Sequence, residues 1–131
     1  MLQHRLRKHA DYQRAYAAAG RKQFGKLLAY FAAPRAAETR SETPGPRVGI
    51  TVPKALGGAV DRNRIKRRLR ECVRLHIDKL EGLPVDVILH PKRTVKDCDY
   101  AALDREVAIT FRAAAAKLGG SKPGTSATFN G

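Results

Sequence analysis

The sequence predicts an α+β fold in which a small sheet is covered by helices, with the element order α-β-β-α-β-α. Three ranges, 5–19, 60–80 and 99–118, carry apolar residues at helical spacing. Three short apolar runs, at 24–32, 47–53 and 85–90, are bounded by Gly and Pro, as strands are. The length of 131 residues and the hydrophobic fraction of 43% fit one folded domain. We assign residues 1–118 to that domain and 119–131, rich in Gly, Ser and Thr, to a flexible tail.

The first half of the chain contains one helix and two strands. The helix over 5–19 is ended by Gly20, which can adopt the left-handed conformation. In the strand over 24–32, Leu28 and Tyr30 are two residues apart and therefore share one face. Residues 33–46 hold three prolines and form a surface connection. The strand over 47–53 alternates, so Val48 and its alternate neighbours face the core while Gly49 faces outward.

The second half of the chain is helix, strand and helix. Apolar residues recur at intervals of three and four from Ile65 to Leu80, and Gly82 and Pro84 end that helix. A strand over 85–90 and a last helix over 99–118 follow. Each helix has a single apolar face to bury, so we expect helices packed in layers on the sheet.

Positive charge is concentrated in one helix. The formal net charge is +14, and residues 1–70 hold 17 Lys or Arg against 4 Asp or Glu. Residues 62–70 include six cations and no acid; only Asp61 and Glu71 flank them. An ordinary exposed helix mixes both signs, so we prefer nucleic-acid contact to a solvated charged face.

A helical wheel divides these cations between two surfaces. The larger one, along the back of the helix, contains Arg64, Arg67, Arg68, Arg70 and Arg74. Arg62 and Lys66 point toward the apolar side, and since unpaired charges are not tolerated in a core, we expect them at a mouth beside the strands. Guanidinium groups suit phosphate, so a polyanion is the expected partner of both surfaces.

Three tyrosines could form an aromatic groove. Tyr12 and Tyr16 share one face of the first helix, and Tyr30 lies on the first strand. If that helix packs across the sheet, the rings line one groove, which would suit unpaired nucleotides because bases stack on rings. The residue pattern alone equally fits ordinary core aromatics.

Catalytic and metal-binding patterns are not found in the sequence. The four His are scattered, and two Cys are too few for a zinc site, so we assign no catalytic and no metal-binding residue. There is no Gly-rich phosphate loop and no nucleophile elbow. No apolar run approaches the roughly 20 residues of a membrane span, and the N-terminus lacks a secretory signal. We expect a cytoplasmic protein that binds RNA or DNA and performs no chemistry itself.

Two motifs resemble a known family. The segments Arg47-Val-Gly-Ile-Thr-Val-Pro-Lys54 and Gly58-Ala-Val-Asp-Arg-Asn-Arg-Ile-Lys-Arg-Arg-Leu-Arg-Glu71 are similar to those of the protein subunit of bacterial ribonuclease P. The likeness extends over roughly residues 5–118. It implies an α/β sandwich with a left-handed β-α-β crossover, like domain 2 of ribosomal protein S5. That handedness runs against the common rule and does not follow from the residue pattern.

The resemblance also implies a function. Members of this family join a large catalytic RNA, one protein to one RNA, to form the enzyme that removes the 5′ leader from precursor transfer RNA. The RNA holds the Mg²⁺ ions and performs hydrolysis, while the protein binds the leader and raises substrate and Mg²⁺ affinity. By the family pattern, contacts to the RNA subunit come from Arg62, Asn63, Arg64, Lys66, Arg67 and Arg70. Contacts to the leader come from Tyr12, Tyr16, Leu28, Tyr30 and Lys54.

Two other readings remain open beside this one. The first is a structural RNA-binding protein of the ribosomal type with no role in cleavage, which could have the same charge and size. The second is a protein nuclease or a basic DNA-binding protein. A nuclease needs clustered carboxylates or His, which the sequence does not show.

Overall fold

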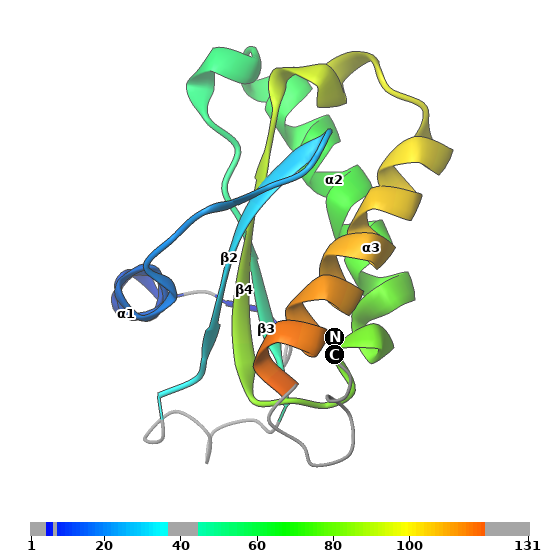
Figure 1. Ribbon diagram of the computed structural model, residues 1–131. Coiled ribbons are helices and arrows are strands. Elements are labelled where there is room, and N and C mark those ends of the chain that lie inside the picture. Colours follow the sequence, from blue (N-terminus) through cyan, green and yellow to red (C-terminus); the bar gives the residue numbers. More distant parts are fainter. Residues whose placement is uncertain (1–4, 7, 37–44, 120–131) are drawn as a thin grey trace.

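The computed structural model describes residues 5, 6, 8–36 and 45–119 (Figure 1). Their helices and strands are α1 (His9–Ala19), β1 (Gln23–Phe24), β2 (Leu28–Pro34), β3 (Arg47–Ile50), α2 (Ala59–His76), β4 (Val85–Pro91) and α3 (Tyr100–Gly119). Three short 3-10 helices lie between these elements among the described residues: η3 (Lys54–Leu56), η4 (Ile77–Leu80) and η5 (Arg93–Asp97). The predicted α+β class is confirmed. Except for Gly119, which ends α3, the predicted tail lies outside the described residues, as do residues 37–44 of the predicted loop.

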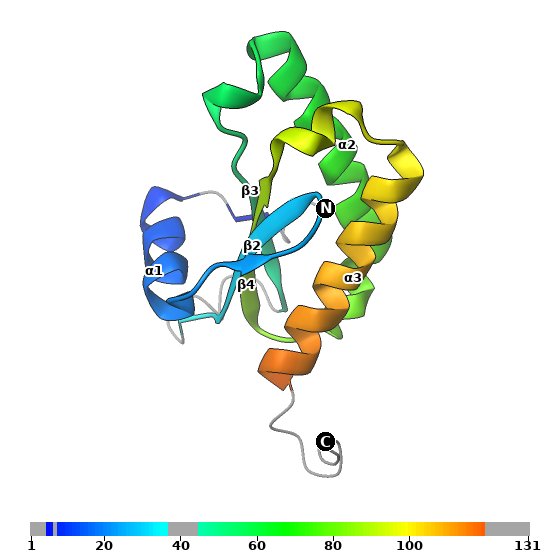
Figure 2. The same cartoon turned by 45° about the horizontal axis from the view of Figure 1, so that its top comes forward.

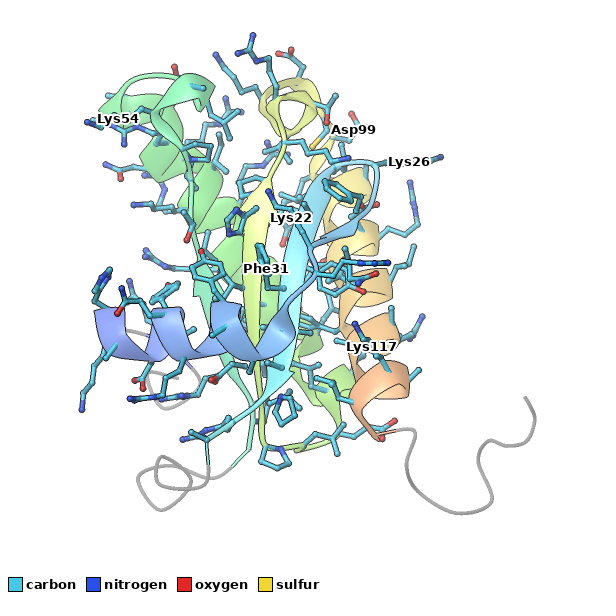
Figure 3. The ribbon with its side chains drawn as sticks, turned by 60° about the vertical axis from the view of Figure 1, so that its left-hand side comes forward. Lys22, Lys26, Phe31, Lys54, Asp99 and Lys117 are labelled. Carbon is cyan, nitrogen blue, oxygen red and sulfur yellow. The ribbon has the colours of Figure 1, made fainter. Side chains whose placement is uncertain are left out.

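The four strands form one mixed sheet in the order β1-β2-β4-β3. β2 pairs antiparallel with both β1 and β4, and β3 pairs parallel with β4. α2 joins those parallel neighbours. In Figure 3, where α1 is in front of the sheet, β3 lies to the left of β4, both strands run upward, and α2 passes behind them. The crossover is therefore left-handed, as the resemblance implied.

Helices cover both faces of the sheet (Figure 2). α2 and α3 share one face, where the larger core lies; Leu103, Val107 and Phe111 recur along α3 at helical spacing and are fully buried in it. α1 lies on the other face, over a smaller core that contains Ala15 and Ile88. Side chains alternate along the strands, so the buried residues of the central strands β2 and β4 are divided between these two cores.

Three sequence predictions need correction at the element level. The first helix starts at His9 instead of residue 5; Arg5 bridges to Val48 and extends the sheet at the β3 edge. The predicted strand over 24–32 is two strands, separated by a turn that begins at Gly25. Gly49 does not face solvent, because the ring of Tyr12 lies over it: a Cβ there would be 2.5 Å from the Tyr12 hydroxyl oxygen.

Candidate nucleic-acid interface

α2 attaches to the sheet through a narrow apolar stripe. Ile65, Leu69 and Cys72 are at most 3% exposed and pack in the larger core. These residues are spaced at three and four, so they occupy one side of the helix and leave the other side to polar residues. The helix runs from Ala59 to His76. In its first three turns the cationic residues lie away from the buried stripe, at the outside of the molecule.

The outer residues of α2 carry positive charge with no compensating carboxylate. We call Arg62, Asn63, Arg64, Lys66, Arg67 and Arg70 the α2 basic surface. Within the described residues, no ion pair involves any of its members. The Arg62 guanidinium instead donates from Nε to the Gly57 carbonyl oxygen at 3.1 Å. Lys66 and Arg62 are half-buried, and the other four residues are exposed. The cations predicted to bind RNA are thus available to an external anion.

Two arginines predicted for the same back surface are already occupied. Arg68 donates to the Cys98 carbonyl oxygen at 3.0 Å and lies 6.0 Å from the centre of the Tyr100 ring. Arg74 forms an ion pair with Glu71 one turn earlier, and this pair raises the pKa of Arg74. Of the five arginines expected along the back of the helix, only Arg74 is therefore paired with an acid among the described residues, while Arg68 keeps its charge and is turned toward Cys98 and Tyr100.

An aromatic surface lies on the other face of the sheet, beside α1. We call Tyr12, Tyr16, Phe31 and His90 the aromatic cluster; all four rings are partly exposed. Tyr16 stands edge-on to Phe31, with ring centres 4.8 Å apart, and its hydroxyl is 3.0 Å from His90 Nε2. Rings that pack on one another and are still partly exposed are held in place before they meet a further ring.

Two residues assigned to leader contact lie on the wrong face. Leu28 is 0% exposed and belongs to the core under α2 and α3. Tyr30 shares that face, as the sequence predicted for the pair, and packs against the same core. The aromatic residue of β2 on the α1 side is Phe31, which pairs across the ladder with Ile88. Strand alternation identifies which residues share a face but not which helix covers it, so the prediction placed the wrong pair in the groove.

The two surfaces are coupled electrostatically. Burial, followed by the charge of Arg5, lowers the pKa of Arg70. Both arginines also interact electrostatically with Tyr12, whose pKa is raised mainly by burial. Arg70 and Tyr12 therefore link the α2 basic surface electrostatically with the aromatic cluster.

A cation also lies at the β1 end of the aromatic cluster. The Lys22 ammonium is 5.9 Å from the centre of the Phe31 ring, and Figure 3 shows the two side chains together on the sheet face above α1. Burial, followed by the charge of Lys22, lowers the pKa of His90. His90 is therefore held neutral in the free protein and presents an uncharged aromatic ring beside a cation.

A buried ion network fixes α1 in place over the sheet. Arg47 on β3 donates from Nε and Nη2 to the two carboxylate oxygens of Asp86 on β4, at 2.9 and 3.0 Å. Its Nη1 donates to Asp11 on α1 at 3.1 Å. All three residues are at most 5% exposed. Burial lowers the pKa of Arg47, but Asp86 and Asp11 more than offset this and raise it overall. Asp11 is next to Tyr12, so the network also sets where the aromatic cluster lies.

The remaining predicted positions give a mixed result. Lys54 is exposed on η3, at the tip of the molecule where α2 begins, and is well away from Phe31 in Figure 3.

Cys72 is fully buried, and burial raises the pKa of its thiol to about 11, so it is an inert packed thiol. In the part of the chain that the structure describes, no three His, Cys, Asp or Glu residues are grouped as metal ligands. In the same part, no helix is long and apolar enough to span a membrane.

Sequence reasoning missed Phe31, His90, Arg5 and the Arg47 network. A signal for Phe31 was present, because the alternation that paired Leu28 with Tyr30 also placed Phe31 on the opposite face. For Arg47 the signal was weaker. It is a charged residue at the start of an otherwise apolar strand, and Asp86 is a charged residue within the next strand along the chain. Nothing in the pattern indicated that these two charges would meet.

Comparison with known proteins agrees with the fold and with the motifs. The family model for ribonuclease P matches residues 2–115. The ribonuclease P protein component of Syntrophus aciditrophicus is 32% identical over 105 residues, covering 80% of this chain and 82% of that protein. That of Finegoldia magna is 42% identical over 74 residues, 56% of this chain and 64% of that protein, so this match spans less than two thirds of the relative.

A solved structure extends the likeness to three dimensions. The RNase P protein of Staphylococcus aureus is 28% identical and superposes with a TM-score of 0.69, covering 85% of this chain and 94% of that one. The match of the family model over most of the chain and the shared fold lead to one conclusion: the chain belongs to the ribonuclease P protein family.

Proposed function

We propose that this protein is the RNA-binding subunit of ribonuclease P, and that it assists a catalytic RNA in removing the 5′ leader from precursor transfer RNA. The observation that supports this most strongly is that one small fold carries both the α2 basic surface, whose cations make no ion pair among the described residues, and the partly exposed rings of the aromatic cluster. Unpaired cations suit the phosphates of a folded RNA, and partly exposed rings suit unpaired bases. Together the two surfaces would allow one small protein to bind a structured RNA and a single strand at the same time.

In this proposal the α2 basic surface binds the catalytic RNA. Arg64 and Arg67 are exposed and make no ion pair among the described residues, so a phosphate meets no competing carboxylate. Arginine offers paired N–H donors that match phosphate oxygens. The rigid attachment of α2 through Ile65 and Leu69 fixes the spacing of these cations before binding. One protein would occupy one such site on the RNA.

The aromatic cluster would bind the unpaired 5′ leader. Each base stacked on a ring contributes about 1–3 kcal/mol, with little preference for sequence. Lys22 at one end of the cluster, and Arg5 with Arg70 at the other, would meet the leader phosphates. These contacts would strengthen binding of the precursor but not of the mature product, which has no leader. Lys54, at the tip near the start of α2, would contact a strand that continues past the cluster.

The hydrolytic step would belong to the RNA. The side chains in the described ranges do not offer a grouped donor set for Mg²⁺, so we assign the metal to phosphate oxygens of the RNA partner and route no step through this protein. The protein would raise Mg²⁺ affinity indirectly, by holding the precursor against the catalytic RNA.

Reconstitution tests this function. The purified protein is mixed with the catalytic RNA of the same organism, and cleavage of a precursor transfer RNA is followed at low Mg²⁺. We expect no cleavage by the protein alone, and faster cleavage by the RNA when the protein is present. Cleavage by the RNA-free protein that is lost on mutating one carboxylate would overturn the division of roles. Tight binding to the RNA with no effect on precursor cleavage would instead indicate a purely structural RNA-binding protein.

A further inference from the structure

Phe24 is a large apolar side chain that the fold leaves outside. It lies on the two-residue strand β1 and is 72% exposed, although residues on the neighbouring strand are buried. Two ammonium groups flank it: Lys92 Nζ is 5.5 Å and Lys22 Nζ is 5.9 Å from the centre of the ring. Both ammonium groups are within cation–π range of the ring, so this exposed residue combines an aromatic surface with two positive charges.

The turn that carries Phe24 is held firmly in place. Glu106 on α3 accepts a hydrogen bond from the backbone N–H of Leu27 at 3.0 Å, and a side chain at Gly25 would collide with that carboxylate. The Gly25 N–H donates to the Leu28 carbonyl oxygen at 2.7 Å, and Lys92 donates to the Gly25 carbonyl oxygen at 2.5 Å. The ring is therefore exposed on a rigid support, so binding to it costs little conformational entropy.

The chemistry around the ring selects one class of ligand. A purely apolar partner would leave Lys22 and Lys92 without a counter-ion, and an acidic peptide would use the lysines but not the ring. An unpaired nucleotide uses both, because its base stacks on the ring while its phosphate meets a cation. The carboxylate of Glu106 accepts from the backbone of Leu27, and among the described residues it forms no ion pair with Lys22 or Lys92.

Lys22 connects this ring with the aromatic cluster. Its ammonium is 5.9 Å from the centre of the Phe24 ring and 5.9 Å from the centre of the Phe31 ring. A phosphate bound by Lys22 would thus have both rings within reach. That arrangement suits successive nucleotides of one strand, with a base on each ring and the phosphate that joins them at the lysine.

We propose that Phe24, with Lys22 and Lys92, forms a second stacking site that binds an unpaired leader nucleotide beyond those held by the aromatic cluster. The proposal depends on the leader-binding function proposed above and adds to it a lower limit on leader length. A leader too short to reach β1 gains nothing from Phe24, and a longer one does.

The test uses the reconstituted complex of protein and catalytic RNA. Dissociation constants are measured for precursors with leaders from one to about ten nucleotides, and for mature transfer RNA, with wild type and with Phe24→Ala. We expect equal affinities for short leaders and, above a threshold length, a loss of about 5- to 150-fold in the variant, from 1–3 kcal/mol per stacked base. Phe24→Tyr should retain the affinity, and Phe24→Leu, which keeps apolar bulk without a ring, should lose it.

Controls separate this proposal from the proposed function. Ile109 is 56% exposed on α3, so Ile109→Ala removes an exposed apolar side chain elsewhere and should change no affinity. If Phe24→Ala equals wild type at every leader length, or weakens all substrates and mature transfer RNA alike, the second stacking site is wrong while leader binding stands. If wild type itself does not distinguish precursor from mature transfer RNA, the leader-binding function has failed instead.

Discussion

We expect Asp86→Asn to lower the free energy of unfolding by about 3 kcal/mol. Asp86 accepts two hydrogen bonds from Arg47, at 2.9 and 3.0 Å, in a site where both side chains are at most 7% exposed. An asparagine keeps one acceptor but turns an N–H donor toward a guanidinium donor, and it removes the negative charge. Breaking a buried pair in this way costs about 3–5 kcal/mol; Asp11, 3.1 Å from the same guanidinium, still supplies one counter-charge and limits the loss to the lower end.

The assay is chemical denaturation of the isolated protein at neutral pH, supported by thermal unfolding. For a domain of this size, 3 kcal/mol corresponds to a fall of about 12 °C in Tm. Arg47→Met should cost more than Asp86→Asn, because it leaves Asp86 buried without its partner, whereas Asp11 retains its ion pair with Arg14. The order of these two losses is as informative as their size.

Two results would refute this reasoning. A loss below about 1 kcal/mol for Asp86→Asn would mean that water reaches the network and screens it. Additive losses in the Arg47→Met and Asp86→Asn double variant would mean that the two side chains do not interact, because partners in one buried pair must show coupling.

Three further predictions concern the two surfaces and their linkage to pH. Gly49→Ala should displace the Tyr12 ring and weaken binding of leader-bearing precursor, measured in the reconstituted complex, while leaving assembly with the catalytic RNA unchanged. Arg64→Ala should weaken assembly and reduce the log–log salt slope by about 0.7–0.9 for the lost phosphate contact; an unchanged slope would remove Arg64 from the interface. His90 has a lowered pKa in the folded state, so it stabilises the fold above its unfolded pKa of about 6.5 and loses that contribution as pH falls below it. His90→Gln should therefore flatten the fall in unfolding free energy between pH 7 and pH 5, and an undiminished fall would contradict this.

Each of these variants has a matched control in the chain. Gly58→Ala adds a methyl group where nothing lies within 4 Å, so it should leave precursor binding intact. Arg74→Ala removes an arginine already paired with Glu71, so its salt slope should stay close to that of wild type. His9→Gln changes an exposed histidine and should preserve the pH dependence of stability.

The sequence predicted the α+β class and the main elements because their periodicities are strong. The apolar stripe from Ile65 to Leu80 and the short alternating strands each admit one interpretation. The sequence could not show which face of the sheet each helix covers, and this placed Leu28 and Tyr30 in the wrong set. Alternation along β2 is equally satisfied by either choice, and only long-range packing decides that Phe31 faces α1.

The chemistry of α2 was predicted in composition but not in detail. The absence of acids among residues 62–70 correctly indicated unpaired cations, because local ion pairs on a helix need a partner three or four residues away. Arg74 has such a partner in Glu71. Arg68 instead donates a hydrogen bond to the backbone carbonyl of Cys98, a contact that depends on tertiary structure. The electrostatic coupling of Arg70 with Tyr12 likewise depends on the arrangement of α1 and α2 around β3.

Site-specific photocrosslinking tests most directly whether the two surfaces hold two different RNAs. A photoreactive phenylalanine replaces Tyr16 in one variant and Arg67 in another, and each is irradiated in the complete complex with precursor transfer RNA. Position 16 should crosslink to the 5′ leader of the precursor, and position 67 to the catalytic RNA. Crosslinks from both positions to the same RNA, or from position 16 to the body of mature transfer RNA, would contradict this division between the aromatic cluster and the α2 basic surface.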